Sequence, residues 1–497
     1  MRKLYILHYL GNIGVVIGIL MLIPALVSFI ARDYSDLNLP VLTFLGPSGF
    51  AILTGLLMHK HIPARNLSTV DAMMLTVFSY VLLSLLSSTT FVLGIQKSWI
   101  DAFFESVSGI TASGLTVFTG LDDLPRGILF WRSMLQWLGG LGILTFFLAV
   151  SFKGSSVAFT LFGAEGNKIS NSRPVPGIHN TIKILWMIYG GFTLAAILLF
   201  YASGMSFFDA LNHSFTCVST GGYSTHDASI GYFAQTGFAN YRLIEYITIL
   251  FMTLGGINFM VHYQFFTGKM KVLFTDFEIR YFWKIIIFFV ILIMIDYLWH
   301  SASPVSQLSF AQLEEIFRKT LFQVIALITS SGFSTQDINS PFFPALSKIV
   351  FIVLMVVGGC AGSTSGGFKV MRVAVFFKMI KNEIFRMVAP RSAINDLVIR
   401  KQMISRSEVE RIGTLFFLWI AIILFGAGIT AIFSDLTPWQ SLSGSVSALG
   451  TMGPHFFSVD QMSSLHWVIK LTYSFSMIAG RIEIIPILVL FSKTTWK

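Results

Sequence analysis

Long apolar segments dominate the hydropathy pattern of the chain. Ten of them approach or exceed the roughly 20 residues that a helix needs to cross a hydrocarbon core of about 30 Å. They lie near 9–30, 40–58, 69–94, 128–152, 182–203, 240–266, 282–300, 343–360, 411–433 and 466–492. The pattern therefore predicts an all-α integral membrane protein with ten transmembrane helices. The first helix is expected to be retained, because no small-residue cleavage site follows it.

Four shorter apolar segments lie between these spans, and each ends in small or polar residues. They lie near 99–113, 206–220, 312–331 and 438–452. They are too short to cross a bilayer, and irregular backbone at membrane depth is tolerated only where protein buries it or where it lines water. We therefore predict four re-entrant pore loops.

The ends of these four segments align on a glycine. The aligned stretches are ESVSGITASGL, NHSFTCVSTGG, QVIALITSSGF and GSVSALGTMGP, with their anchors at Gly114, Gly221, Gly332 and Gly453. A small-residue pair follows in each next span, namely Gly139-Gly140, Gly255-Gly256, Gly358-Gly359 and Ala479-Gly480. Such internal periodicity indicates one supersecondary unit copied four times. The pairs are expected to let neighbouring spans pack closely.

The repeat divides the chain into five parts. Two extra N-terminal helices occupy 1–66, and four pore repeats follow at 67–175, 176–275, 276–400 and 401–497. Each repeat is expected to contain a span, a short helix, a glycine-bearing strand and a second span. Because all four share one orientation, we predict that they surround an axis with pseudo-fourfold symmetry.

Composition and charge agree with this topology. The chain is 54% hydrophobic and 12% charged, about half the charged fraction of a soluble protein. Its net charge is +10, and most Lys and Arg residues fall in the loops 59–65, 153–183, 267–284 and 368–411. Ten spans place these loops on one side together with both termini, and that side should be cytoplasmic. The charge is thus explained by topology, and no nucleic-acid partner is expected.

The anchor glycines have a physical rationale in an ion path. Glycine adopts positive φ without a Cβ clash, so successive carbonyl groups can face one axis and replace a cation's hydration shell. The short helices would direct their partly negative C-terminal ends toward the path. Asp227 and Asp337 would enrich cations at its mouth. We predict a path for a dehydrated monovalent cation. The alternative, close helix packing at each glycine, does not explain four in register.

The predicted filter comprises each anchor glycine and three positions before it. These residues are Ile110, Thr111, Ser113 and Gly114; Cys217, Val218, Thr220 and Gly221; Ile328, Thr329, Ser331 and Gly332; and Leu449, Gly450, Met452 and Gly453. Met452 stands where Ser or Thr precedes the other three glycines. This position of the ring is expected to be less polar, which places strict fourfold coordination in question.

Four motifs connect the chain to a known family. They are WLGGLGI at 137–143, STGGYSTHD at 219–227, GGCAGSTSGGFKVMR at 358–372 and LGTMGP at 449–454. Together they resemble the Trk/Ktr/HKT superfamily of potassium transporters over nearly the whole chain. The two extra N-terminal helices favour its TrkH-like branch. The resemblance implies four fused units, each like a potassium-channel subunit with a helix–pore-loop–helix arrangement.

The same resemblance carries expectations about cargo, partners and location. Four glycines in the filter favour potassium as the transported ion, and no cofactor is expected in this chain. The implied partners are a second copy of the chain in a homodimer, a separate cytosolic TrkA-like nucleotide-binding regulatory ring, and membrane lipid. The implied location is the bacterial cytoplasmic (inner) membrane, with both termini in the cytoplasm.

A glycine-rich run, GGCAGSTSGG at 358–367, is one candidate for a gate. No regular helix favours it, because each interior glycine costs up to about 1 kcal/mol relative to alanine. The resemblance places here an intramembrane loop that obstructs the pore, formed by Gly358, Gly359, Gly362, Ser363, Thr364, Gly366 and Gly367. A flexible packing kink is the alternative. The spacing does not match a phosphate-binding loop.

Arg481 is the second candidate for a gate, in the middle of the last predicted span. A charge there costs about 2.5–3.5 kcal/mol on insertion scales, so it should face water or a partner. The resemblance places it in the pore below the filter as a positive barrier. A pair with Glu483 is the alternative, but residues two apart lie on different helix faces. Lys369 and Arg372 are expected to be cytoplasmic flanks or partner contacts.

Two other classes of function are alternatives to channel-like permeation. A coupled secondary transporter would favour inverted repeats around a midplane site, whereas these repeats share one orientation; proton- or sodium-coupled potassium symport stays an open alternative. An enzyme is not expected. The single histidines His213, His226, His262 and His455 show no metal-ligand spacing, and no carboxylate pair accompanies them.

Overall fold

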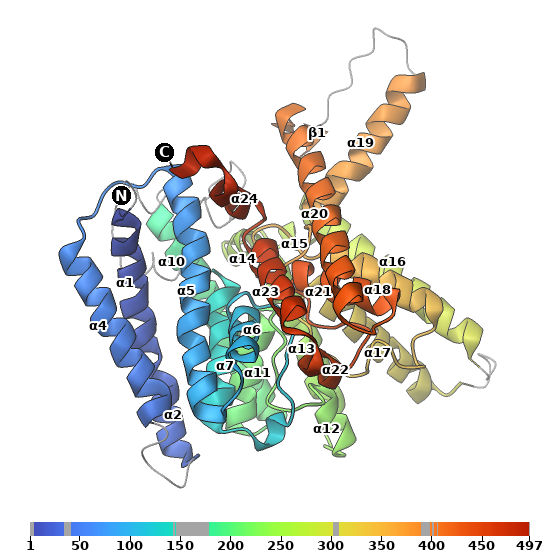
Figure 1. The fold of residues 1–497 in the computed structure, drawn as a ribbon. Coiled ribbons are helices and arrows are strands. Elements are labelled where there is room, and N and C mark those ends of the chain that lie inside the picture. The colour runs from blue at the N-terminus through green and yellow to red at the C-terminus, as the bar shows by residue number, and fades with distance from the viewer. Residues whose placement is uncertain are drawn as a thin grey trace.

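The computed structural model describes residues 4–33, 41–142, 145, 178–301, 308–388, 398–399, 402–404 and 406–496. The chain forms a bundle of helices in which the two termini lie at the same end (Figure 1). The short helices α12 (Gly231–Gln235) and α22 (Val459–Ser464) lie at the opposite end. The predicted placement of both termini on one side of the membrane agrees with this arrangement.

The N-terminal helices pack as an antiparallel unit. It consists of α1 (Tyr5–Leu20), α2 (Leu22–Ala31), the π-helical turn η1 (Val41–Leu45) and α4 (Gly46–His61). Glycines bring α1 and α4 together: a Cβ on Gly55 would overlap the carbonyl oxygen of Gly11, and one on Gly11 would lie 2.8 Å from that of Gly55. Close backbone approach of this kind is how helices associate where lipid removes a hydrophobic driving force.

The remaining helices follow the order of the four predicted repeats. The first holds α5 (Thr69–Ile95), α6 (Trp99–Ile110), η2 (Leu121–Asp123) and α7 (Arg126–Gly140). The second holds α10 (Ile178–Ala202), α11 (Phe207–Val218), α12, α13 (Tyr241–Gly256) and α14 (Phe259–Phe266), followed by α15 (Val272–Thr275). The third holds α16 (Phe277–His300), α17 (Phe310–Ile328), α18 (Ala345–Val357) and α19 (Val370–Val388).

The last repeat begins after a two-stranded antiparallel hairpin of β1 (Val398–Ile399) and β2 (Gln402–Met403), which sequence reasoning did not predict. Its helices are α20 (Arg406–Phe433), α21 (Pro438–Gly450), α22, α23 (Trp467–Arg481), α24 (Ile485–Phe491) and η4 (Lys493–Trp496). Helices α19 and α20 extend past the bundle at the end that carries the termini (Figure 1).

Six helical segments of the described chain are long and apolar enough to cross a membrane, or eight if each of two bent pairs counts as one span. The bent pairs are α13–α14, with a 100° bend, and α23–α24, with a 116° bend. The hydropathy pattern predicted one span for each pair, at 240–266 and 466–492. Lipid-facing side chains such as Leu198, Ile291 and Phe425 are 59%, 52% and 64% exposed, as expected of helices surrounded by hydrocarbon.

Several predicted segments fall partly outside the described residues. The basic loop 153–183 lies outside them up to residue 177, and so does the predicted span 128–152 after 142, apart from 145. Of the basic loop 368–411, residues 389–397, 400, 401 and 405 lie outside.

The four short helices begin in the same way. A hydroxyl group accepts a hydrogen bond from the backbone nitrogen three residues on, an arrangement that satisfies a free amide of the first turn. The pairs are Ser98 with Asp101, Ser206 with Asp209, Ser309 with Gln312, and Thr437 with Gln440. Ser/Thr followed by Asp/Gln at the third place is thus a fourfold sequence signal that locates the helix starts and that the hydropathy pattern does not contain.

Candidate functional site

The backbone after each short helix follows one repeated course. A residue in the left-handed region, with φ of 52° or 53°, comes first, and a glycine with positive φ follows two places later. The first residues are Ala112, Thr220, Ser330 and Thr451. The glycines are Gly114, Gly222, Gly332 and Gly453, with φ of 78°, 79°, 77° and 95°. The four loops are therefore copies in conformation as well as in sequence.

The structure corrects the alignment of the second loop by one residue. Its ring glycine is Gly222, whereas the sequence alignment placed the anchor at Gly221. The backbone nitrogen of Gly221 bonds the oxygen of Thr216 at 2.8 Å, just as Ser113 bonds Ser108 at 2.9 Å in the first loop. Two adjacent glycines allowed either register, and only the backbone geometry distinguishes them.

The predicted filter residues of the second loop shift accordingly. Cys217, Val218, Thr220 and Gly221 are replaced, position by position, by Val218, Ser219, Gly221 and Gly222. As a result the residue before the ring glycine is Gly221, so neither Ser nor Thr stands there. The second loop thus departs from the first and third at this position, as the fourth loop does through Met452.

The four glycines form a closed ring. A Cβ on Gly332 would lie 2.7 Å from the carbonyl oxygen of Met452, and one on Gly453 would lie 3.3 Å from that of Ser113. A Cβ on Gly114 would overlap the oxygen of Gly221. A Cβ on Gly222 would overlap the oxygen of Ser331. Each loop thus meets the carbonyl group of the next, and the fourth returns to the first. A side chain at any of the four positions would narrow the opening that the four glycines surround.

The other predicted filter residues are buried around this ring. They are Ile110, Thr111, Ser113, Cys217, Val218, Thr220, Gly221, Ile328, Thr329, Ser331, Leu449, Gly450 and Met452. Two of their hydroxyl groups bond behind the loops: that of Ser113 to Thr111 at 2.7 Å, and that of Ser331 to the sulfur of Met252 at 2.6 Å. The structure therefore brings the predicted set together in one place.

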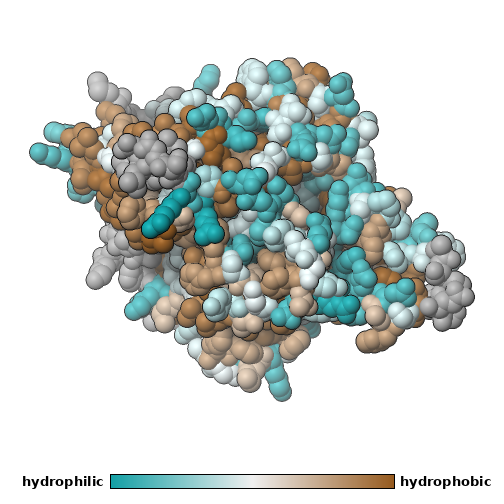
Figure 2. All heavy atoms as spheres, turned by 90° about the horizontal axis from the view of Figure 1, so that it is seen from below, coloured by the Kyte–Doolittle hydropathy of each residue, from teal (hydrophilic) through white to brown (hydrophobic). Residues whose placement is uncertain are grey.

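A cavity of about 500 Å³ opens beside the ring, on the side toward which the chain continues after each glycine. All four ring glycines line it, together with Asp227 and Asp337. Figure 2 views the molecule from the end that carries α12 and α22, where hydrophilic side chains spread over much of the face. The predicted acidic residues at the mouth are thus part of this outer cavity.

His226 connects two loops in the outer cavity. Its Nδ1 bonds Asp122, and its Nε2 lies 3.6 Å from a carboxylate oxygen of Asp209. The ring stacks on Tyr232 with centroids 3.5 Å apart. Burial disfavours the charged imidazole, but the carboxylates of Asp209 and Asp122 outweigh it and raise the pKa of His226 above its ordinary value.

The glycine-rich segment 358–367 lies beneath the C-terminal ends of the short helices. The Thr364 hydroxyl lies 3.1 Å from the carbonyl oxygen of Val218. The Gly366 nitrogen bonds the Ser330 hydroxyl at 2.5 Å, and the Gly367 nitrogen bonds the Gly450 oxygen at 3.0 Å. The segment therefore contacts the pore loops of the second, third and fourth repeats. It lies on the opposite side of the ring from the outer cavity.

Glycine is required in this segment because neighbouring atoms approach its backbone closely. A Cβ on Gly366 would overlap the Thr451 hydroxyl and the Gly450 carbonyl oxygen. Within the segment, a Cβ on Gly358 would overlap the Gly366 oxygen, and one on Gly359 would overlap the Ser365 hydroxyl. These contacts explain the composition better than a loose kink does. The other predicted members, Gly362, Ser363 and Gly367, lie in the same non-helical segment between α18 and α19.

Arg481 is the last residue of α23, at the break before α24, and is therefore not in the middle of a straight span as predicted. Positive φ at Glu483 and Ile484 ends the helix there. One guanidinium nitrogen donates to the Thr364 oxygen at 2.7 Å, and the other donates to the carbonyl oxygens of Gly139 and Gly140. Arg481 thus joins the glycine-rich segment to the first repeat.

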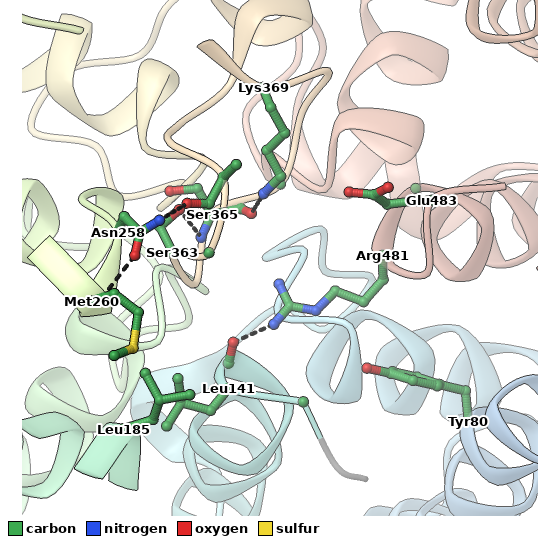
Figure 3. Close-up of a pocket in the computed structure, with 16 residues that line it drawn as sticks. Tyr80, Leu141, Leu185, Asn258, Met260, Ser363, Ser365, Lys369, Arg481 and Glu483 are labelled. Carbon is green, nitrogen blue, oxygen red and sulfur yellow. Dashed lines mark hydrogen bonds between the residues drawn. The ribbon is translucent and has the colours of Figure 1, made fainter. Parts of the chain in front are cut away.

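Arg372 and Lys369, which were expected to be cytoplasmic flanks or partner contacts, make contacts within the chain. Arg372 forms an ion pair with Glu483 at 2.6 Å, and the Lys369 ammonium group donates to the carbonyl oxygen of Ser365. Glu483 therefore pairs with Arg372. This agrees with the expectation that Arg481 and Glu483 lie on different helix faces. A small cavity of about 70 Å³ lies between these groups and is lined by Tyr80, Leu141, Asn258 and Arg481, among others (Figure 3).

The small-residue pairs allow the predicted close packing and also mark where helices stop. A Cβ on Gly139 would overlap the oxygen of Ile110, and one on Gly480 would overlap that of Leu449. A Cβ on Gly255 would lie 2.9 Å from the Val218 oxygen. Helices α7 and α13 end at such a pair, α18 ends directly before one, and α23 ends directly after one. In the first, second and fourth repeats, the second helix therefore packs against a filter loop through its small-residue pair and then ends.

Sequence reasoning missed three buried polar residues that hold the loops. Glu105 and Arg132 form an ion pair at 2.7 Å, with 0% and 1% of their side chains exposed. Gln136 spans the second ring glycine, because its amide donates to the Gly221 oxygen at 2.8 Å and accepts from the Tyr223 nitrogen at 3.0 Å. The available signal was polar side chains inside apolar segments, which are costly unless paired.

Among the residues that the structure describes, no group of three or more His, Cys, Asp or Glu side chains is placed to hold a metal ion. Both cysteines, Cys217 and Cys360, are buried as free thiols. The candidate site is therefore the axis itself, with the glycine ring between an outer cavity and the glycine-rich segment.

Comparisons with known proteins agree with this geometry. The family model TrkH, described as a cation transport protein, matches residues 48–496. The Trk system potassium uptake protein TrkH of Escherichia coli (strain K12) is 30% identical over 482 residues, 96% of each chain. An uncharacterized cation transporter of Methanocaldococcus jannaschii is 32% identical over 494 residues, 99% of this chain and 96% of that one. The crystal structure of the potassium transporter TrkH from Vibrio parahaemolyticus superposes with a TM-score of 0.85 at 28% identity, covering 100% of both chains.

Proposed function

Because this chain belongs to the TrkH family of cation transport proteins, we propose that it mediates potassium uptake across the bacterial cytoplasmic membrane by channel-like permeation through the glycine ring. It is a multi-pass membrane protein, by its apolar helices and its relatives. The names of the relatives support potassium as cargo. The single observation that carries the mechanism is the closed ring of four positive-φ glycines on four homologous loops.

The ring supports selective permeation because backbone oxygens converge there without side chains. The carbonyl oxygens of Ser113, Gly221, Ser331 and Met452 each lie against the next glycine around the ring. Such rings replace the hydration shell of a monovalent cation, and their selectivity depends on cavity size and on the number of coordinating dipoles. Met452 approaches Gly332 with its backbone carbonyl group. Its apolar side chain therefore does not by itself prevent the carbonyl oxygen from coordinating a cation.

The segment 358–367 and Arg481 form the proposed gate. Contacts from this segment reach three of the pore loops, and the Arg481 guanidinium ties it to the first repeat. A loop that crosses the axis obstructs an ion, and a positive charge beside it repels a cation. The described conformation is thus assigned to a closed state, and conduction requires the segment to move aside.

The proposed assembly rests on the family resemblance. The relatives are named as proteins of a Trk system, which supports a transport system of more than one component. The proposed partners are a second copy of this chain in a homodimer, a cytosolic TrkA-like nucleotide-binding ring on the basic inner loops, and the surrounding membrane lipid. The proposed topology has cytoplasmic termini, two leading helices and four pore repeats.

Ion flux into liposomes that contain the purified protein tests this function. Uptake of potassium and rubidium well above that of sodium and lithium, driven by the potassium gradient alone and unchanged by a protonophore under a clamped voltage, is the expected result. Flux that requires a proton or sodium gradient would instead establish coupled symport. Equal uptake of all four ions would contradict a selective filter.

A further inference from the structure

The corrected register reveals a polar position behind the filter loops. Nine residues before each ring glycine, on the short helices, stand Glu105, His213, Gln323 and Gly444. The first three side chains are 0%, 0% and 1% exposed. A buried polar side chain is costly unless it is bonded. The partners of these residues therefore show what the position does.

In the first loop, Glu105 binds the strand that follows the ring glycine. The Thr116 hydroxyl lies 2.9 Å from one of its carboxylate oxygens, and the Val117 nitrogen donates to the other at 3.0 Å. Arg132 donates to the first oxygen from two nitrogens, at 3.0 and 2.7 Å. Charge-assisted bonds are the strongest of their kind, so the carboxylate fixes this strand from behind.

Arg132 extends the connection to the second loop. Its guanidinium donates to the Thr116 hydroxyl at 3.2 Å and to the carbonyl oxygen of Ser224 at 3.3 Å. It also lies over the Tyr223 ring, 4.2 Å from the centroid, while the Tyr223 hydroxyl donates to the backbone carbonyl oxygen of Glu105 at 2.9 Å. Thr116 and Ser224 each stand two residues after a ring glycine. One buried cation therefore connects equivalent points on neighbouring strands.

His213 holds the same point of the second loop. Its Nδ1 donates to the Asp209 carbonyl oxygen at 2.8 Å, since a carbonyl group can only accept. Its Nε2 lies 3.0 Å from the Ser224 hydroxyl. Glu105 with Thr116 and His213 with Ser224 are thus equivalent pairs, with a side chain of the short helix bound to a hydroxyl group of the strand.

The third and fourth loops lack this arrangement. Within the described part of the chain, both polar atoms of the Gln323 amide are buried without a hydrogen-bond partner. At Gly444 the space is occupied by the Tyr473 hydroxyl, which a Cβ would overlap, and by the Phe457 ring, 3.0 Å from that Cβ. A bonded polar side chain at this position therefore holds only the first two loops. The strands of the third and fourth loops are bonded from other positions, by Ser229 to the Ser334 nitrogen at 3.3 Å and by Ser443 to the Phe456 nitrogen at 3.0 Å.

We propose that Glu105, Arg132 and His213, bonded to Thr116 and Ser224, set the positions of the first and second filter strands and thereby determine how well the ring distinguishes potassium from sodium. These are positioning residues, because they act through the backbone that bears the carbonyl groups. The inference rests on the proposed function. It assigns the discrimination between potassium and sodium to the first and second loops, which these bonded residues hold. A coordinating site that is loosened by a fraction of an ångström loses its preference for one ion radius.

The test compares Glu105→Gln and Thr116→Val with matched controls. Glu245→Gln breaks another buried ion pair, with Arg318, and Thr76→Val removes a buried hydroxyl that bonds Ala72 of its own helix at 2.8 Å. Flux of potassium and sodium into liposomes is measured for each protein. Both network variants are expected to lower the potassium-to-sodium ratio by about threefold or more, because each removes bonds to the strand, while the controls keep the parent ratio.

Each outcome has a separate meaning. If Glu105→Gln fails to fold, Thr116→Val still decides, because it leaves the ion pair in place and is nearly equal in volume. A selective parent with an unchanged ratio in folded Thr116→Val overturns the inference and leaves the proposed function standing. So does an equal fall in the controls, which would show a general loss of stability. A parent without selectivity contradicts the proposed function itself.

Discussion

Arg481 donates a hydrogen bond of 2.7 Å to the carbonyl oxygen of Thr364. This contact ties the break in the last repeat to the glycine-rich segment of the third. The same guanidinium donates to Gly139 and Gly140 of the first repeat, and the Thr364 hydroxyl lies 3.1 Å from that of Thr220 in the second. Arg481 and Thr364 therefore connect all four repeats through hydrogen bonds beneath the ring.

Replacing Arg481 with glutamine should raise the basal flux of potassium. The change removes charge-assisted bonds, each worth about 1.5–3 kcal/mol, and removes the positive barrier. A loss of this size shifts a closed-to-open equilibrium by roughly tenfold or more. Rubidium uptake into liposomes without any regulatory partner is the measurement. Arg242→Gln, at an exposed outer position, serves as the control, and a folded Arg481→Gln protein with unchanged or reduced uptake would refute the gate.

The fit of the glycine-rich segment under the ring gives a second prediction. Gly366→Val would place a side chain where the Thr451 hydroxyl and the Gly450 oxygen already lie, so the segment cannot occupy its closed position. Basal uptake should rise by about tenfold, the change that roughly 1.4 kcal/mol produces. Gly413→Val adds its side chain where the structure has open space. Similar uptake by the two variants would show that the segment does not close the path.

The corrected register of the second loop can be tested directly. Gly222→Ala introduces a Cβ at φ of 79° and against the Ser331 oxygen. It should abolish selectivity, because a non-glycine residue held at such a φ costs about 1–3 kcal/mol. Gly221 has no positive φ, and a Cβ there meets only the Gln136 side chain among its nearest atoms. Gly221→Ala should therefore keep more of the potassium-to-sodium ratio, because the added methyl group meets a side chain and not the backbone of a neighbouring loop. The opposite ranking would restore the original alignment.

His226 gives the outer loops a pH dependence. Its folded pKa is raised by Asp209 and Asp122 against the effect of burial. The stabilisation is therefore complete below the unfolded value of about 6.5 and is lost as the pH rises through the raised folded value. The melting temperature should fall between pH 6 and pH 8 more in the parent than in His226→Gln. Parallel curves for the two proteins would show that the imidazole carries no charge-dependent contact.

Sequence alone predicted the fourfold repeat of a short helix followed by a glycine-bearing loop, because this pattern depends on local chemistry. The gating role of 358–367 was implied by the family resemblance and stays a prediction. Small polar residues after the short helices and the glycine-rich run at 358–367 are unusual in apolar surroundings, and this made both of them visible in the sequence. Their convergence on one axis followed from the repeat, and the closed ring agrees with it.

Three features were not predictable from the hydropathy pattern. The register between Gly221 and Gly222 depends on backbone torsions that both glycines tolerate. The breaks after Gly256 and Arg481 lie inside segments that pass as single spans when hydropathy is averaged over a window. Contacts such as Arg132 with Glu105 join residues far apart in the chain. Ten spans and four re-entrant loops stay predictions beyond the spans that the structure describes.

The central claim is that the glycine ring selects the ion, and Gly332→Ser tests it most directly. The ring position has φ of 77°, and a Cβ there would lie 2.7 Å from the Met452 oxygen. Potassium, rubidium, sodium and lithium fluxes into liposomes are measured for the parent, for Gly332→Ser, and for Gly428→Ser, where a side chain meets open space. The account predicts a potassium- and rubidium-selective parent, relaxed selectivity in Gly332→Ser alone, and a parent-like Gly428→Ser. Unchanged selectivity in a folded Gly332→Ser protein would contradict it.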